Sequence, residues 1–287
     1  MSLFKLKDKK TVGTENVPRI LDTKVPFAVR ESFNLLRTNL MYTITENDTT
    51  PIYAITSVAE SSGKSTIITN LALSFSQIGK KVLLIDGDMR CPVVHKFFNL
   101  DEKRAGLSEL IPGIEKDVVL KDIRPGLDLI TSGRIPPNPS ELLTSPRLKK
   151  LIDRWKEEYD VIFIDFPPIG VVTDALAVCQ EITGYIFCVR SGRNVAKEIL
   201  DAVESMEQIG AKVVGMVLND YNLKGSGGYY YSSRYSKYGK YGKYSRYSRY
   251  SKYSRYSKYS MSQYERSTLS YSAEPKSDQK KETEDKQ

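Results

Sequence analysis

The chain has 287 residues, of which 40% are hydrophobic, and carries a formal net charge of +8. That length accommodates one large domain, or one domain and a tail. No apolar run is long enough to span a bilayer and the N-terminus lacks a signal-peptide pattern, so we expect a cytoplasmic protein. The three cysteines, Cys91, Cys179 and Cys188, have no C-x-x-C spacing, which argues against a zinc or iron–sulfur site.

The charge is distributed unevenly along the chain. Residues 1–228 carry 29 basic and 29 acidic side chains, whereas residues 229–287 carry 14 basic and 6 acidic ones, together with 14 of the 19 tyrosines. Between Leu223 and Met261 the chain has no aliphatic residue, so this segment cannot bury enough apolar surface to offset its ordering entropy. We therefore predict a flexible segment over 1–25, a globular domain over 26–224, and a disordered tail over 225–287.

Helical and strand patterns alternate through the globular part. A helix with recurring apolar residues is predicted over 26–45. Nearly all-apolar, β-branched stretches predict strands over 52–58, 82–86, 127–131, 161–165, 185–189 and 213–218. Between them we expect helices over 65–78, 140–158 (capped by Ser140), 173–181 and 194–208, with short helical pieces over 93–111. This alternation predicts an α/β fold in which helices cover both faces of a parallel sheet.

The stretch 57–66 lies between the first predicted strand and the helix that follows it. A strand, a tight loop of small residues and a helix opening with Gly-Lys-Ser-Thr are typical of a phosphate-binding loop, and so of a P-loop NTPase-like fold. Backbone N–H groups and the helix dipole would then bind phosphates, with Lys64 on the outer phosphates. Val58 stands where the full pattern has glycine, and the alternative is a serine-capped helix. The predicted nucleotide-binding residues here are Ser61, Ser62, Gly63, Lys64, Ser65 and Thr66.

Aspartates end two further strands at the same expected edge of the sheet. Asp86 ends the second predicted strand, with Asp88 two residues later, and Asp165 ends the fourth. Oxygen ligands are what magnesium prefers when it bridges the terminal phosphates of a nucleotide. We therefore predict ATP and Mg²⁺ as cofactors, with Ser65, Asp88 and Asp165 as metal ligands. Each aspartate alone could instead be a turn or cap residue.

In combination these motifs resemble the bacterial tyrosine kinases that accompany capsular or exopolysaccharide synthesis in Gram-positive organisms. The resemblance covers roughly residues 26–225 and the tyrosine-rich end. It is carried by the loop at 63–66, the acidic segment 84–90, the strand end at 162–168 and the segment 136–143. It implies a catalytic set of Lys64, Asp86, Asp88 and Asp165, with Asp86 accepting the tyrosine proton. It also implies that Asn219 contacts adenine and that Arg90 contacts the nucleotide. For Arg90, the alternative role is a salt bridge to the acidic residues that flank it.

The resemblance also implies partners. These are a ring-like homo-oligomer, a membrane-embedded polysaccharide co-polymerase that activates the kinase and recruits it to the inner face of the membrane, a cognate tyrosine phosphatase, and pathway enzymes as substrates. The family's self-association motif, Glu-x-x-Arg-x-x-Arg, reads Glu31, Asn34, Arg37 here, so the middle arginine is lost. Phe166 replaces the family's threonine, and Ala59 stands where cell-division and partitioning ATPases of this superfamily carry a second lysine.

The tail repeats a basic residue and a tyrosine every three residues from 235 to 259. A flexible tether would raise the local concentration of these hydroxyls to about millimolar at an active site. We therefore predict that the tail is the substrate of the kinase, modified in trans between subunits. The predicted sites are Tyr229, Tyr230, Tyr231, Tyr235, Tyr238, Tyr241, Tyr244, Tyr247, Tyr250, Tyr253, Tyr256 and Tyr259.

Other functions are compatible with the same residues. A basic, aromatic tail suits single-stranded nucleic acid or anionic lipid, or it could simply aid solubility, although we expect no nucleic-acid partner. The chain as a whole could be a non-kinase P-loop ATPase switch of the positioning or partitioning type, with a tail that binds DNA or membrane. It could also be an interaction module with an inert site.

Overall fold

The computed structural model describes residues 20–21, 25–44 and 50–221 of the chain. The chain divides into two units, Met1–Asn222 and Leu223–Gln287, and every described residue belongs to the first. The predicted boundary at 224–225 and all the tail tyrosines lie outside the described residues.

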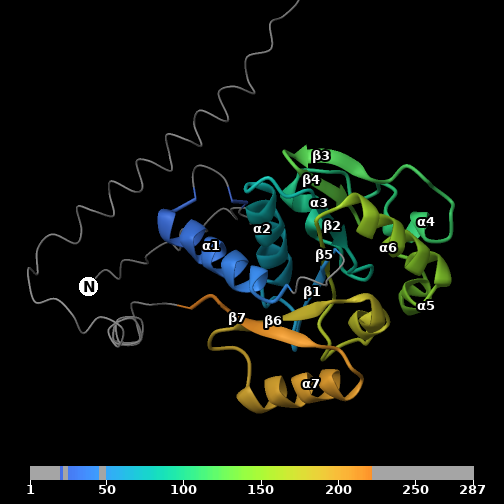
Figure 1. Ribbon diagram of the computed structural model, residues 1–287. Coiled ribbons are helices and arrows are strands. Elements are labelled where there is room, and N and C mark those ends of the chain that lie inside the picture. The colour runs from blue at the N-terminus through green and yellow to red at the C-terminus, as the bar shows by residue number, and fades with distance from the viewer. Residues whose placement is uncertain (1–19, 22–24, 45–49, 222–287) are drawn as a thin grey trace, which may run out of the picture. The chain divides into compact units, whose positions relative to one another are not determined.

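A seven-stranded sheet forms the centre of this unit (Figure 1). The strand order is β3-β4-β2-β5-β1-β6-β7, and every neighbouring pair is parallel except β3 and β4. The strands are β1 (Ile52–Ser57), β2 (Val82–Asp86), β3 (Leu120–Arg124), β4 (Leu127–Ile130), β5 (Val161–Asp165), β6 (Gly184–Arg190) and β7 (Val213–Asn219). The predicted parallel sheet between helices is confirmed.

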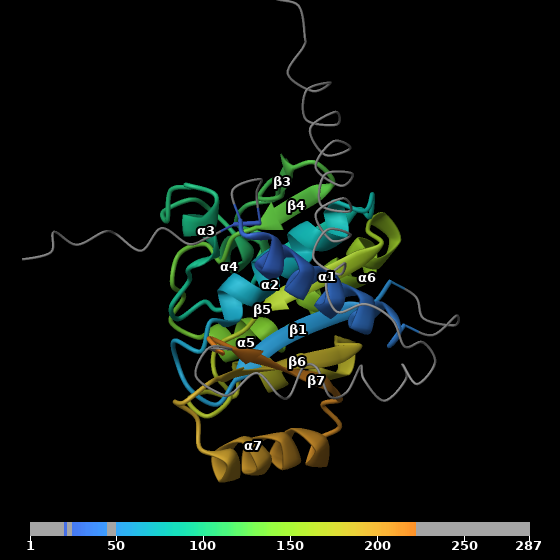
Figure 2. The same ribbon diagram turned by 90° about the vertical axis from the view of Figure 1, so that its left-hand side faces the viewer.

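Helices cover both faces of the sheet, as Figures 1 and 2 show from two directions. Strand side chains alternate between two apolar clusters: Ile52 and Ala54 of β1 join one, and Tyr53 and Ile55 the other. The second cluster packs under α1 (Phe27–Met41), α2 (Lys64–Ser76) and α3 (Val94–Phe97). The first packs under α4 (Leu107–Leu110), α5 (Pro139–Leu143), α6 (Pro146–Glu158) and α7 (Ala196–Gln208). Burial on both faces explains why the central strands are almost entirely apolar.

The predicted helix over 140–158 is wrong in one respect, because it is two helices. Pro146 lacks a backbone N–H and disfavours helical backbone at the residue before it, so α5 ends before Pro146 and α6 begins with it. Ser145 caps α6 by accepting a hydrogen bond from the N–H of Arg147 at 3.2 Å. The N-cap of α5 is Asn138 rather than Ser140, whose hydroxyl donates elsewhere.

Two further differences concern short elements. The predicted helix over 173–181 consists of two 3₁₀ turns, η1 (Asp174–Leu176) and η2 (Cys179–Glu181). The Ala175 carbonyl accepts a hydrogen bond from the Tyr185 hydroxyl at 2.5 Å, so a tertiary contact takes a group that a longer helix would use. Strand β3 was not predicted, because it is short, half-exposed and polar. It pairs with β4 through a tight turn in which Gly126 has φ +74°.

Candidate active site

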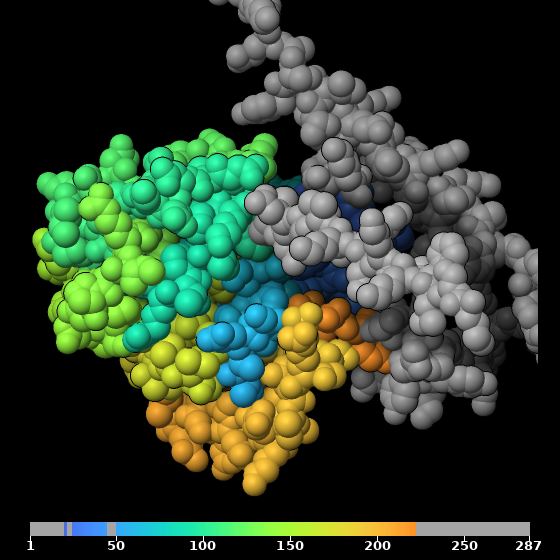
Figure 3. Space-filling model, turned by 180° about the vertical axis from the view of Figure 1, so that it is seen from behind, coloured from blue at the N-terminus to red at the C-terminus, as the bar shows by residue number. Residues whose placement is uncertain are grey.

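The loop between β1 and α2 adopts the shape that the sequence predicts for phosphate binding. Helix α2 begins at Lys64, with Gly63 as N-cap at φ +93° and no side-chain cap. The positive φ favours glycine here, and a Cβ at Gly63 would lie 2.1 Å from Asn219 Nδ2, so it would also displace that amide. Ser65 and Thr66 are half-buried in the first turn of α2, where the dipole favours an anion. In Figure 3 this region, in light blue, reaches the surface between the teal segment after β2 and the yellow segment near the end of β6.

Carbonyl groups of the loop are bound from behind by side chains. The Ala59 carbonyl accepts hydrogen bonds from the hydroxyls of Ser57 and Ser62, each at 2.7 Å. The Ser62 carbonyl accepts from Asn219 Nδ2 at 2.9 Å and from the Cys188 thiol at 3.2 Å. In a trans peptide the following N–H points away from the carbonyl. Fixing these carbonyls therefore turns loop N–H groups to the opposite side, where a phosphate would need them.

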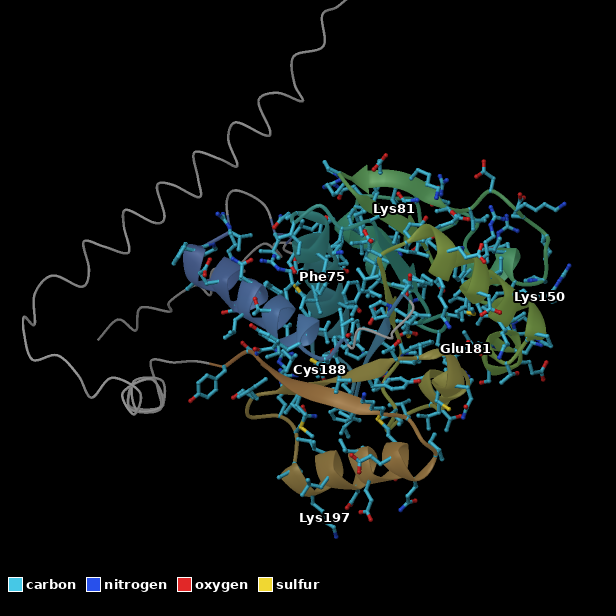
Figure 4. All side chains as sticks on the ribbon, in the orientation of Figure 1. Phe75, Lys81, Lys150, Glu181, Cys188 and Lys197 are labelled. Carbon is cyan, nitrogen blue, oxygen red and sulfur yellow. The ribbon has the colours of Figure 1, made fainter. Side chains whose placement is uncertain are left out.

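Cys188 lies on β6 inside the sheet (Figure 4). Burial raises the pKa of its thiol to about 12, so Cys188 acts here as a neutral donor and not as a thiolate. Asn219 donates its amide N–H to the Ser62 carbonyl of the loop, and its predicted contact with adenine stays a prediction. Its Oδ1 is the part that remains for a base.

Asp86 and Asp165 come together at the carboxyl edge of the sheet. They are register partners on β2 and β5, with 0% and 1% of their surfaces exposed. The Gly87 N–H donates to the Asp165 carbonyl at 2.8 Å, and a Cβ at Gly87 would lie 2.9 Å from that oxygen. The glycine thus lets the end of β2 press against the end of β5. The predicted convergence of strand ends is seen directly.

The two carboxylates differ in how they are satisfied. Asp86 accepts the N–H groups of Val94 at 3.0 Å and Asp88 at 3.3 Å. Neither carboxylate oxygen of Asp165 has a hydrogen-bond partner among the described residues. Burial raises the pKa of Asp165 to about 7, with Asp88 adding to the rise and the nearby Lys64 ammonium and Ser65 hydroxyl opposing it. Burial, and then the Asp165 charge, raise the pKa of Asp86 well above its ordinary range.

These residues fit a magnesium ion. A buried carboxylate without partners is costly unless a cation or a proton compensates it. Asp165 is such a group, and Ser65 and Asp88 supply further oxygens of the kind that magnesium prefers. Asp88 is held in place by its own backbone, because its Oδ1 accepts the N–H groups of Cys91 at 2.9 Å and Arg90 at 3.2 Å. The assignment of Ser65, Asp88 and Asp165 as magnesium ligands stays a prediction.

Arg90, close to Asp88 in sequence, forms a two-point salt bridge with Asp174. Its Nε donates to Asp174 Oδ2 at 2.7 Å and its Nη2 to Asp174 Oδ1 at 3.0 Å, while the Ser140 hydroxyl donates to Oδ1 at 2.7 Å. Burial alone would raise the pKa of Asp174, but the hydrogen bonds from Arg90 and Ser140 lower it. The salt bridge of Arg90 is thus made with Asp174 on η1, and not with the aspartates that flank it in sequence. Sequence reasoning missed Asp174, which has no neighbouring motif to mark it.

The helix α1 carries the residues predicted for self-association. Asn34 donates to Glu31 Oε1 at 2.9 Å on the exposed surface. Arg37 instead reaches α2, where its Nη1 donates to the Ser74 carbonyl at 2.7 Å. Within the chain, therefore, only Glu31 and Asn34 of the three point their polar groups toward solvent and each other.

Comparison with known proteins decides the family. The ParA family model, described as NUBPL iron-transfer P-loop NTPase, matches residues 48–240. Tyrosine-protein kinase CpsD of Streptococcus agalactiae is 40% identical over 207 residues, which cover 71% of this chain and 88% of that protein. The chain is a member of the bacterial protein-tyrosine kinases. The solved chimerical protein CapA2B2 superposes with a TM-score of 0.64 at 39% identity, over 69% of this chain and 86% of that one.

The alternative ATPases are more distant from this kinase. The septum site-determining protein MinD from Pyrococcus horikoshii, solved with Mg-ADP, has a TM-score of 0.52 at 22% identity, over 60% of this chain and 71% of that one. That likeness concerns the fold alone. Within the ranges described, no helix has the length and apolar character to cross a membrane.

Proposed function

We propose that this kinase transfers the γ-phosphoryl group of ATP to tyrosines of its own C-terminal cluster. The observation that carries the proposal is the meeting of Asp86, Asp165 and Lys64 at one sheet edge, in a chain with a regular tyrosine repeat over residues 235–259. Lys64 and the loop amides would bind the phosphates. Asn219 Oδ1 would accept a hydrogen bond from the amino group of adenine, since Nδ2 already donates to the Ser62 carbonyl.

The site residues would divide the chemistry as follows. A bond forms between the tyrosine oxygen and the γ-phosphorus, and the bond from that phosphorus to the bridging oxygen of ADP breaks. Ser65, Asp88 and Asp165 would hold magnesium, which when bound neutralises charge on the phosphate oxygens. Once the metal–nucleotide complex has displaced the proton of the aspartate pair, Asp86 takes the tyrosine proton, and its raised pKa then makes it a stronger base than an ordinary aspartate. Since Asp86 has no exposed surface in this structure, the transfer requires the site to open toward it when nucleotide and tyrosine bind.

Phosphorylation would invert the charge of the tail. Each phosphate adds about −1.5 to −2 charge, so about five modified tyrosines cancel the excess of +8. A change of that size would alter how the tail associates with other subunits or with a partner. We propose this as the regulatory output of the kinase in the synthesis and export of capsular or extracellular polysaccharide.

Intact mass spectrometry tests the activity. The purified chain is incubated with MgATP beside a Lys64→Met control, which removes the outer-phosphate contact. We expect a ladder of phosphate additions that phosphatase removes, that maps to residues 229–271, and that the control lacks. Phosphate on the control protein, made in cells without other tyrosine kinases, would contradict the assignment.

A mixing experiment tests transfer in trans. Full-length Lys64→Met protein with a mass tag is the acceptor and the untagged wild-type chain is the donor. Phosphate on the tagged chain, at an initial rate that rises with donor concentration, is expected. Modification confined to the untagged chain would show that each molecule uses its own tail.

We further propose that a membrane-embedded co-polymerase recruits the kinase to the inner face of the membrane and activates it. A tyrosine phosphatase would reverse its action, and enzymes of the pathway would be further substrates. Cell fractionation tests the recruitment: the kinase should leave the membrane fraction when the co-polymerase is deleted. A kinase that stays in that fraction would argue for direct lipid binding by the basic tail.

A further inference from the structure

Arg190 ends β6 at the same sheet edge as the phosphate-binding loop and was not identified from the sequence. Its Nη1 donates to the Ser61 carbonyl at 2.8 Å. Its backbone N–H donates to Asn194 Oδ1 at 2.8 Å, so the strand end is itself tied down. The signal that could have found it is an arginine directly after the apolar strand 185–189.

The conformation of Ser61 makes this contact consequential. Ser61 has φ +55°, a left-handed backbone that non-glycine residues seldom adopt without compensation. Because the Ser61–Ser62 peptide is trans, holding its carbonyl toward Arg190 directs the Ser62 N–H to the opposite side. Asn219 and Cys188 hold the next carbonyl in the same way. The Ser62 N–H has no partner among the described residues, as a phosphate-binding amide requires.

Asp220 holds the arginine from the other side. Its Oδ2 accepts from Arg190 Nε at 3.1 Å and from Nη2 at 3.0 Å, which leaves Nη1 for Ser61. The Ser191 N–H also donates to the Asn219 carbonyl at 2.9 Å, so β6 and β7 are joined just where Asp220 begins. A guanidinium suits this arrangement because its planar fork bonds two partners at once.

We propose that Arg190, oriented by Asp220, is a positioning residue that sets the Ser62 N–H for phosphate binding. The proposal rests on nucleotide binding at this loop, as the proposed function does, but not on transfer to tyrosine. Arg190 acts through the backbone of Ser61 and does not itself touch the nucleotide. Loss of the Arg190 side chain should therefore lower the affinity of the loop for every ligand that carries the bound phosphates, whether or not the ligand has a base.

Isothermal titration with Mg·ADP and with magnesium pyrophosphate tests this directly on the full chain. For Arg190→Ala we expect affinity for both ligands to fall by about tenfold, as for the loss of one charged hydrogen bond. Arg193→Ala, an exposed arginine three residues on, is the matched control and should bind both ligands as the wild type does. Arg190→Lys keeps one donor and should recover part of the loss.

Two results would overturn the proposal outright, and a third outcome is resolved by a second variant. Pyrophosphate affinity could stay unchanged while ADP affinity falls, which would make Arg190 a base contact. Both affinities could equal those of Arg193→Ala. The ligand-free melting temperature of Arg190→Ala could fall so far that unfolding alone explains the loss; in that case Asp220→Ala, which leaves the Ser61 contact but frees the arginine, must show a smaller loss of affinity for both ligands. Failure of the wild type to bind ADP would instead refute the proposed function.

Discussion

Asp86 and Asp165 are register partners on adjacent parallel strands, and both are buried at the edge of the sheet. Two ionised carboxylates in this position repel each other and have lost most of their hydration. The ligand-free protein therefore holds a proton there near neutral pH, and a metal–nucleotide complex must displace it.

The Asp165→Asn variant should be more stable than the wild type at pH 8. Because the folded pKa of about 7 lies above the ordinary value of 3.8, this group favours the folded state fully below pH 3.8, and that contribution is lost as pH rises through 7. We expect a gain of about 2 kcal/mol in the free energy of unfolding at pH 8, and a smaller one at pH 5.5. Urea unfolding of the nucleotide-free proteins at both pH values measures it. An equal difference at the two pH values would contradict the buried-proton account.

Binding of Mg·ADP should release protons below pH 7. The metal needs an ionised Asp165, so protons compete with it, and affinity should fall by up to about tenfold for each pH unit below the pKa. Titration calorimetry in two buffers with different ionisation enthalpies measures the protons released. Identical heats in both buffers at pH 6 would show that the pair is already ionised in the free protein.

Gly87→Ala should lower activity by separating the ends of β2 and β5. A Cβ there would meet the Asp165 carbonyl at 2.9 Å and Ile164 Cγ2 at 3.0 Å. We expect a loss of about 1–3 kcal/mol in stability and a fall in kcat. Gly215→Ala on β7 is the control, since nothing lies within 4 Å of its Cβ. Equal effects of the two substitutions would indicate a general effect of replacing glycine by alanine and not a clash at the site.

Arg90 and Asp174 should behave as one unit in a double-mutant cycle. Two pairs of atoms join Arg90 to Asp174, which is 1% exposed. Either Arg90→Ala or Asp174→Asn therefore removes the same salt bridge. We expect each to lower kcat by about tenfold and the double variant to add little further. Additive losses would mean that Arg90 acts on the phosphates independently of Asp174.

Asn34→Arg should strengthen self-association by restoring the arginine that the family motif carries. The new guanidinium would replace the Asn34 amide on the exposed surface of α1 and carry donors for a carboxylate of a second subunit. Sedimentation velocity should show a shift to larger species. Asn39→Arg, exposed on another face of the same helix, adds the same charge and should leave the distribution unchanged. A similar shift in both variants would point to a charge effect.

The sequence predicted the parts of the site that depend on local pattern. The apolar strands with terminal aspartates, and the Gly63-Lys64 helix start, follow from periodicity and loop chemistry. Contacts between distant segments could not be predicted: Asp174 meets Arg90 only because the fold brings η1 against the Pro139–Leu143 helix. Arg190 was missed for the same reason, since Ser61 lies 129 residues before it. Strand β3 lacks an apolar sequence pattern because it is the edge strand of the sheet and most of its residues are exposed.

Helix α2 connects the phosphate-binding loop to helix α1. Its first turn follows the phosphate loop, and its Ser74 carbonyl, near the other end, accepts Arg37 from α1. Its 13 residues span about 20 Å as one rigid rod. If α1 joins subunits, then thermodynamic reciprocity applies across this rod: assembly must change nucleotide affinity by the same factor as nucleotide changes assembly. The kinase would then sense its own state of association without any dedicated regulatory domain.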